Sequence, residues 1–311
     1  MLNDTQVHMK NYKLTTVVSL LLAAIIIISC KTRFETTKAE YKATVSPAAL
    51  ERGRVLVYSI CAGCHLNHAD NKFIGNRIED VPGIAGKVYS ANLTHSKEHG
   101  IPPRYSDAEL KYLFKTGIAK DGRFLSYMLR PNMADADIND IIVFLRSDDP
   151  AMAAADTTIG LTHFNVLGKI YMGMHADPLP YKAGIKRPTE PVALGRYLVD
   201  NLGCFHCHSK SLTSLNFQYP EQTKGYLAGG IKLKGENGAE MVAPNITPDK
   251  NTGIGNYTRE QFLKALKDGE APDRKLHPPM PKFNMLNNGE IDAIYAYLMT
   301  VPTKDHKVEM H

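Results

Sequence analysis

Cysteine is scarce in this chain, with five residues among 311. Four of the five belong to two units of the form Cys-x-x-Cys-His, at Cys61–His65 and Cys204–His208, and the fifth is Cys30. The chain also lacks lysine and arginine clusters interleaved with aromatic residues, which argues against nucleic acid as a partner. Hydrophobic residues make up 43% and charged residues 22% of the chain, a composition that indicates a globular rather than a disordered protein.

The uncharged run Leu14–Ser29 is shorter than the ~20 residues that a membrane-spanning helix needs. It follows two lysines, as the apolar part of a secretory signal follows a basic start. Its ending, Ile-Ile-Ser-Cys, is similar to the lipobox of bacterial lipoproteins, which predicts cleavage before Cys30 and a lipid on that cysteine. Residues 1–30 are therefore interpreted as a lipoprotein signal peptide, with Met9 as an alternative start and an uncleaved signal anchor as the alternative topology.

The lipoprotein interpretation and the signal-anchor interpretation both predict a protein of the bacterial cell envelope. The chain would be exported and tethered to the membrane, and it would face the periplasm or the outer side of that membrane. Residues 31–45 are mostly polar and show no periodicity, so we expect a flexible tether there.

The two halves of the chain repeat one another. In each half a Gly-Arg pair and an apolar stripe precede the Cys-x-x-Cys-His unit, and a proline stands at the expected start of that helix. Matching positions continue further along the chain. They are Asn92 with Asn245, Thr94 with Thr247, and Tyr105 with Tyr257.

Each half then shows a capped helix that ends at a glycine, a loop with a methionine, and a final amphipathic helix. The capping pairs are Ser106 with Glu109 and Thr258 with Gln261, and the glycines are Gly117 and Gly269.

Few stretches show the alternating pattern of a strand, so we expect an all-α fold. The duplication predicts two helical domains, at residues 46–147 and 188–303. Residues 148–187 would form a long irregular connector with a short helix at 160–172. Residues 304–311 would form a tail.

Cys-x-x-Cys-His is the attachment signature of c-type haem. Two thiols at this spacing can each form a thioether with one vinyl group of haem, and the adjacent histidine then lies beneath the iron as its axial ligand. The sequence therefore predicts two haem c groups. The attachment residues would be Cys61, Cys64, Cys204 and Cys207, and the iron ligands His65 and His208.

Other uses of the cysteine pairs explain the pattern less well. One zinc ion shared by the two pairs does not account for a histidine after each pair or for the duplication around it. A thioredoxin-type redox motif requires a βαβ setting, which the sequence does not predict. Disulfides between cysteines three residues apart would be strained.

A methionine is the expected sixth ligand of an electron-transfer haem. Met128 and Met280 each lie eleven residues after the glycine that ends the capped helix, and Met280 is flanked by prolines that stiffen its loop. Each half has a second methionine five residues later that we expect to fill its core. These core methionines are Met133 and Met285, and the alternative ligands are His95 and His277.

The second half resembles the class I cytochrome c domains of di- and trihaem cytochromes. This family includes the cytochrome subunits of membrane-bound quinoprotein alcohol and sugar dehydrogenases. The stretches that carry the resemblance are residues 227–258, LAGGIKLKGENGAEMVAPNITPDKNTGIGNYT, and residues 277–281, HPPMP. The resemblance implies two tandem class I cytochrome c domains with haem on the cysteine and histidine residues named above. It also implies that Asn245, Thr247 and Tyr257 wall the haem, with Tyr257 where the family usually has tryptophan.

Two functional hypotheses follow. The first is a membrane-anchored electron carrier between a dehydrogenase or quinol-oxidising respiratory complex and an acceptor, such as a terminal oxidase or a soluble cytochrome. No residue would then act as a catalytic acid, base or nucleophile. The alternative is a dihaem enzyme, a peroxidase or thiosulfate-oxidising cytochrome, with an open or displaceable ligand at the haem of the first domain.

Overall fold

The computed structural model describes residues 15–19, 33–79, 81, 86–156, 160–235 and 238–308. Cys30 and most of the apolar run before it lie outside the described residues, so the signal peptide and its lipid remain predictions. Among the residues described, none of the helices combines the length and apolarity needed to cross a bilayer.

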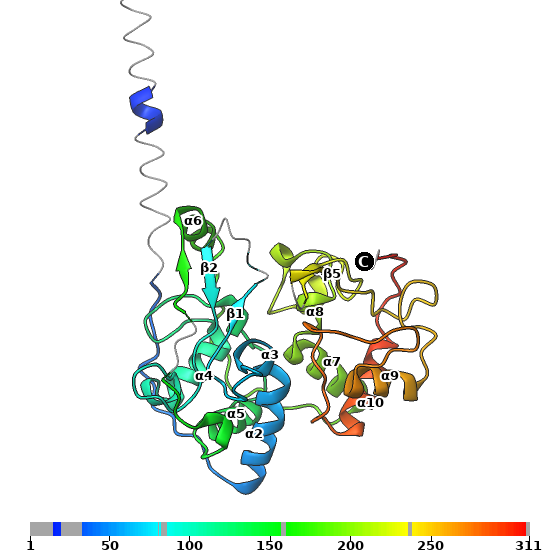
Figure 1. Ribbon diagram of the computed structural model, residues 1–311, viewed down its shortest axis with the longest axis horizontal. Helices are drawn as coiled ribbons and strands as arrows, with labels where there is room; N and C mark the ends of the chain where they lie inside the picture. The colour runs from blue at the N-terminus through cyan, green and yellow to red at the C-terminus, as the bar shows by residue number, and fades with distance from the viewer. Residues whose placement is uncertain are drawn as a thin grey trace, which may run out of the picture.

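The described chain is helical with little sheet, as the sequence predicts (Figure 1). The helices are α2 (Pro47–Ile60), α3 (Ala62–His65), α4 (Asp107–Thr116), α5 (Asp135–Leu145), α6 (Val166–Met174), α7 (Pro191–Leu202), α8 (Cys204–Cys207), α9 (Arg259–Asp268) and α10 (Asn288–Leu298). The strands are β1 (Arg77–Ile78), β2 (Gly86–Tyr89), β3 (His163–Phe164), β4 (Lys232–Lys234) and β5 (Glu240–Val242).

Buried apolar side chains form two clusters, one mainly in each part of the chain, and Ala134 from the first part belongs to the second cluster. The first cluster gathers residues of α2, α4 and α5, and the second gathers residues of α7, α9 and α10 (Figure 1). We refer to residues 33–156 as the first half and to residues 191–308 as the second half. The first cluster extends past the predicted boundary at residue 147, because Ala151 and Met152 are buried in it.

In each half the helix before the Cys-x-x-Cys-His unit crosses the last helix at a glycine. α2 packs on α5 at Gly53, where a Cβ atom would lie 1.9 Å from the backbone oxygen of Asp140. α7 packs on α10 at Gly195, where a Cβ atom would lie 1.8 Å from the backbone oxygen of Ala293. Only glycine lets two helix backbones approach this closely. The repeated Gly-Arg pairs of the sequence thus correspond to a repeated packing contact.

The predicted helix ends are confirmed. The Ser46 side chain accepts a hydrogen bond from the Ala49 N–H at the start of α2. Both predicted capping boxes, at the starts of α4 and α9, form completely. Gly117 and Gly269 end these helices in the left-handed conformation. A third capping box that the sequence analysis did not predict, between Asn287 and Glu290, starts α10.

The structure adds short strands that the sequence does not predict. β2 pairs with β1 on one side and with β3, from the predicted connector, on the other. The predicted helix at 160–172 is therefore wrong at its start. α6 begins only at Val166, because the Asn165 side chain accepts from the Gly168 N–H and the two residues before Asn165 belong to β3.

The predicted tether differs from the structure from Arg33 onward. The Phe34 N–H donates to the Gly122 carbonyl at 2.8 Å, and the Phe34 ring contacts that of Phe124. Further along, Ala43 is buried in the first cluster, and its N–H donates to Asp107 at 2.9 Å. Apolar residues inside this mostly polar stretch therefore dock residues 33–45 on the first half as an extended strap.

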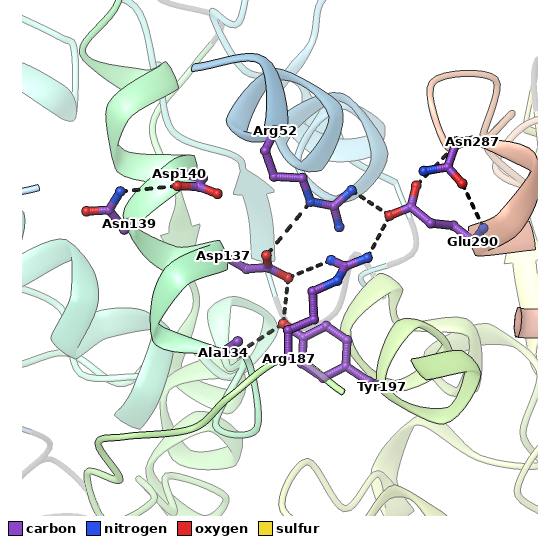
Figure 2. Close-up of polar contacts among 9 residues, drawn as sticks. All are labelled: Arg52, Ala134, Asp137, Asn139, Asp140, Arg187, Tyr197, Asn287 and Glu290. Atoms are coloured by element: carbon purple, nitrogen blue, oxygen red, sulfur yellow. Dashed lines mark hydrogen bonds and ion pairs between the residues drawn. The ribbon is translucent and has the colours of Figure 1, made fainter. Parts of the chain in front are cut away.

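A ring of four charged side chains joins the two halves (Figure 2). Arg52 from α2 and Arg187 alternate with Asp137 from α5 and Glu290 from α10. The nitrogen–oxygen distances are 2.6 Å for Arg52–Glu290, 2.6 Å for Arg187–Glu290, 2.9 Å for Arg187–Asp137 and 3.8 Å for Arg52–Asp137. The Tyr197 hydroxyl on α7 donates to Asp137 at 2.7 Å. Because both carboxylates are buried, the ring holds the halves in a defined arrangement.

Candidate functional site

Each Cys-x-x-Cys-His unit folds as one helical turn directly after the long helix that precedes it. α3 follows Cys61, and α8 spans Cys204–Cys207. Residues three apart on a helical turn lie on one face, so the two cysteines of each unit face the same side. Burial raises the pKa of the Cys61 and Cys204 thiols to about 12, so the neutral thiol is the stable form at neutral pH.

The histidine of each unit is buried and oriented by one hydrogen bond. Nδ1 of His65 lies 2.7 Å from the carbonyl oxygen of Ala91, and Nδ1 of His208 lies 2.8 Å from that of Pro244. Because a carbonyl oxygen can only accept, Nδ1 carries the proton in each ring and the lone pair of Nε2 is left to bind a metal. Burial lowers the pKa of both imidazoles, which favours the neutral form that binds metals.

The carbonyl that orients each histidine belongs to the residue before an Asn-x-Thr turn. Oδ1 of Asn245 accepts from the backbone N–H and the hydroxyl of Thr247, at 2.9 and 2.8 Å. Oδ1 of Asn92 accepts the same two bonds from Thr94, at 2.8 and 2.7 Å. All four residues are buried. Their contacts position the two carbonyls, whereas the role of Asn245 and Thr247 as a haem wall remains a prediction.

Tyr257, the third predicted wall residue, lies partly buried against the second cluster. Its backbone carbonyl accepts from the Tyr295 hydroxyl at 2.7 Å, and burial raises the pKa of its phenol.

Backbone groups of one residue after the last helix of each half are hydrogen-bonded to these turns. Nδ2 of Asn92 donates to the Ala155 carbonyl at 2.8 Å, and Nδ2 of Asn245 donates to the Lys304 carbonyl at 2.7 Å. The N–H groups of Ala155 and Lys304 donate in return to the threonine of the same turn, each at 3.2 Å. The predicted tail, residues 304–311, thus supports the second site where it is described. No local sequence signal marks either contact.

The two predicted methionine ligands lie beside the clusters that hold the cysteines. Met128 ends a 3-10 turn, Ser126–Met128, and packs against the first cluster, to which Cys61 belongs. Met280 packs against the second cluster, as Cys204 does. Both methionines are only half-buried, whereas Met133 is fully buried in the first core, as expected for a residue that fills it.

The alternative ligands have other positions. Nε2 of His95 lies 2.9 Å from the Leu145 carbonyl at the end of α5, so this histidine has a structural bond. His277 is exposed, and its carbonyl accepts from the Met280 N–H at 3.1 Å. Met285, which the sequence predicts as a core residue, is only half-buried and, unlike Met280, does not pack against the second cluster, so that prediction is wrong.

The shared zinc site finds no support in the described part of the chain. No three or more His, Cys, Asp and Glu side chains gather there in a way that could hold a metal ion. One cysteine of each pair, Cys61 and Cys204, packs in a different hydrophobic cluster.

Arg130 links the two units, although no motif of the sequence points to it. Its Nε donates to the Asn201 carbonyl of the second half at 2.9 Å. Its charge acts on the thiols of Cys61 and Cys64, and it contributes, after burial, to a strongly lowered pKa of His206. Both Cys-x-x-Cys-His units therefore face the contact between the halves. The one signal in the sequence is the position of Arg130, two residues after the predicted ligand Met128.

Asp200 on α7 is a buried acid near Cys204. The Tyr226 hydroxyl donates to it at 3.1 Å, and burial raises its pKa to about 7. The folded protein therefore keeps this proton up to near pH 7, whereas the unfolded chain releases it near pH 4. This contribution to stability is complete below about pH 4 and is lost as the pH rises through 7.

Asp200→Asn is expected to remove this pH dependence. At pH 8 the variant should exceed the wild type in unfolding free energy by about 2–4 kcal/mol, and the two should converge near pH 4. Denaturant unfolding across this range measures the effect, with Asp177→Asn, an exposed position, as the control. An unchanged wild-type slope in Asp200→Asn would contradict the assignment.

Haem c fits the residues of both sites. Each site has two cysteines on one face of a turn, a neutral histidine with Nε2 left for iron, and a methionine beside the same cluster. In both sites the same kind of hydrogen bond, from Nδ1 of the histidine to a backbone carbonyl, orients the ring. The duplication seen in the sequence therefore extends to the hydrogen bonds.

No protein-family model matches the sequence. The cytochrome subunit of the fructose dehydrogenase of Gluconobacter japonicus is 28% identical over 270 residues, which are 82% of this chain and 53% of that protein. The cytochrome c subunit of the quinone alcohol dehydrogenase of Gluconobacter oxydans (strain 621H) is 38% identical over 108 residues, 34% of this chain and 20% of that protein. A dihaem c-type cytochrome of Cereibacter sphaeroides is 30% identical over 112 residues, 35% of this chain and 36% of that protein.

These relatives are cytochrome c subunits of dehydrogenases and a dihaem cytochrome c, which confirms the resemblance inferred from the sequence. The chain spans about half the length of the fructose dehydrogenase subunit and less of the other two. The homology indicates electron transfer by haem c.

Proposed function

We propose that the protein is a membrane-anchored dihaem c-type cytochrome that carries electrons from a dehydrogenase or quinol-oxidising complex to a downstream acceptor. The two halves would be tandem class I cytochrome c domains, each with one haem. The observation that carries this proposal is the repeated histidine geometry, in which a backbone carbonyl fixes Nδ1 and leaves Nε2 for iron in both halves.

A haem c bound at each site would supply a one-electron couple between Fe(II) and Fe(III). His208 would ligate the iron through Nε2, with its ring plane fixed by the Pro244 carbonyl. Met280 would give a thioether ligand, which favours the reduced state and raises the potential. His65 and Met128 have the corresponding roles in the first half. With a histidine and a methionine both bound to each iron, neither site would bind substrate, and the chain would carry electrons from one haem to the other.

The relatives suggest the partners. Two of them are subunits of dehydrogenases for fructose and for alcohol, so a dehydrogenase is the electron donor that we propose. A terminal oxidase or a soluble cytochrome would accept the electrons. A lipid on Cys30 would hold the protein at the membrane, facing the periplasm or the outer side.

Met280→His is expected to lower the potential of one haem and leave the other unchanged. Histidine is a stronger donor to Fe(III) than a thioether, so the shift should be on the order of 0.2 V, within the ~0.8 V range that axial ligands span. Potentiometric titration of the visible spectrum resolves the two one-electron steps.

Met285→His is the matched control, because this methionine lies five residues further on and is also half-buried. It should leave both potentials in place. If Met285→His shifts a potential and Met280→His does not, the ligand assignment is wrong.

A further inference from the structure

Helix α6 turns an apolar face to solvent. Among its described residues only Gly168 is buried. Val166, Leu167 and Met174 are 66%, 58% and 70% exposed, and Tyr171 is also exposed. Leu167, Tyr171 and Met174 lie four, three and seven residues apart, so they share one face of the helix, and Val166 lies at the edge of that face. An apolar face of this size on one surface helix indicates contact with another apolar body.

The residues after α6 connect it to the strap. The Leu179 N–H donates to the Thr116 carbonyl at 3.2 Å, five residues after α6 ends. The Tyr181 ring stacks on that of Tyr112, with centroids 5.9 Å apart, and the Tyr112 hydroxyl donates to the Glu35 carbonyl at 3.4 Å. Figure 1 shows α6 on the side where the described strap begins.

The start of the strap is fixed close to the predicted lipid. Arg33 forms an ion pair with Asp121, and Phe34 is bonded to Gly122. Cys30 precedes Arg33 by three residues, and three residues span at most about 11 Å. A lipid on Cys30 would therefore hold this side of the first half against the bilayer, instead of leaving the protein on a long tether.

The charges around α6 suit a membrane surface. Lys169 on α6 is exposed, and so is Lys87, which pairs with His163 on the neighbouring strand β3. An apolar helical face flanked by lysines is the pattern of helices that lie in the interface of a bilayer with anionic headgroups.

We propose that α6 lies on the lipid bilayer, with Val166, Leu167, Tyr171 and Met174 in the interfacial region. This inference deepens the proposed function and rests on its membrane anchor at Cys30. Together, lipid and helix give the protein two attachment points, which set its orientation relative to membrane-bound redox partners.

Photo-crosslinking in intact cells tests the contact. Tyr171→p-benzoylphenylalanine places a photoreactive group on the α6 face of the full haem-loaded chain. Tyr219→p-benzoylphenylalanine is the matched control, because Tyr219 is 46% exposed against 44% for Tyr171 and lies in the second half. Mass spectrometry of the labelled peptides should find phospholipid adducts at position 171 at least tenfold above those at position 219.

Protein adducts at position 171 would overturn the proposal and assign the face to a partner subunit. Lipid adducts equal at both positions would overturn it as well. The mass of the peptide that begins at Cys30 separates the two claims. An acylated Cys30 without lipid adducts at 171 refutes the α6 contact alone, whereas adducts at 171 without acylation refute the lipid anchor alone.

Vesicle binding of a haem-loaded chain that begins at Lys31 tests α6 without the lipid. This chain is exported with a cleavable signal peptide in place of residues 1–30, because Cys30→Ser alone would leave the apolar run attached. Sedimentation with phosphatidylcholine–phosphatidylglycerol vesicles should show partitioning that Leu167→Asp with Met174→Asp lowers about tenfold or more. Leu50→Asp, at a position 40% exposed on α2, should leave partitioning unchanged. Equal loss in both variants would count against α6 as the binding face.

Discussion

Replacing Gly195 with alanine is expected to lower the unfolding free energy by about 3 kcal/mol or more. A methyl group there would lie 1.8 Å from the Ala293 backbone oxygen, so α7 and α10 must move apart. The movement would loosen the core on which Cys204 and Met280 pack. Denaturant unfolding followed by circular dichroism measures the loss, and Gly53→Ala should have the same effect in the first half, at the crossing with Asp140.

Gly289→Ala is the control on the same helix. Gly289 is exposed on α10, and its nearest atom to a new Cβ is the side-chain Oδ1 of Asn287 at 3.3 Å. The expected change is within about 1 kcal/mol, because alanine has the higher helix propensity. If Gly195→Ala proves as stable as Gly289→Ala, the close helix crossing is contradicted.

Asp137→Asn is expected to destabilise the protein by about 3 kcal/mol and to weaken the coupling between the halves. The substitution keeps the shape of the side chain but removes a buried negative charge, so that Arg52 and Arg187 share Glu290 alone (Figure 2). Since the ring spans both halves, differential scanning calorimetry should show one unfolding transition for the wild type and two for the variant.

Asp140→Asn is the matched control, one helical turn further along α5. Its carboxylate bonds to the neighbouring Asn139 and takes no part in the ring (Figure 2). This variant should keep the single transition and most of the stability. Similar effects of the two substitutions would mean that the ring does not hold the halves together.

The features that the sequence predicts well are local. Proline, serine and threonine caps and the two glycines fix the starts and ends of α2, α4 and α9, because each signal acts within one helical turn. The two Cys-x-x-Cys-His units can be recognised for the same reason, since each lies within five consecutive residues, and their role as haem sites is our proposal. The alignment of the two halves then predicts Asn92 and Asn245 as matching positions, although not their partners.

The remaining features depend on distant residues. Arg52 and Glu290 of the ring are 238 positions apart, and the Pro244 carbonyl that orients His208 follows it by 36. The sequence predicts a tether around Ala43 because its few apolar residues show no periodicity, yet these residues dock on a surface that forms only after folding. Likewise Lys304, which the sequence places in a tail, is hydrogen-bonded to the Asn245 turn through its backbone N–H and carbonyl. Every residue except proline has both groups, so the residue type gives no sign of this contact.

The visible and near-infrared absorption spectrum of the purified protein, oxidised and reduced, with haem counted per chain, distinguishes a dihaem electron carrier from a dihaem enzyme. For the electron carrier we expect two low-spin haems per chain, each with the weak near-infrared band of methionine bound to Fe(III), and no change on adding peroxide, cyanide or thiosulfate. A haem count other than two would contradict this proposal. So would a high-spin fraction that binds these ligands, which would identify an open haem in the first half and make the dihaem enzyme the better description.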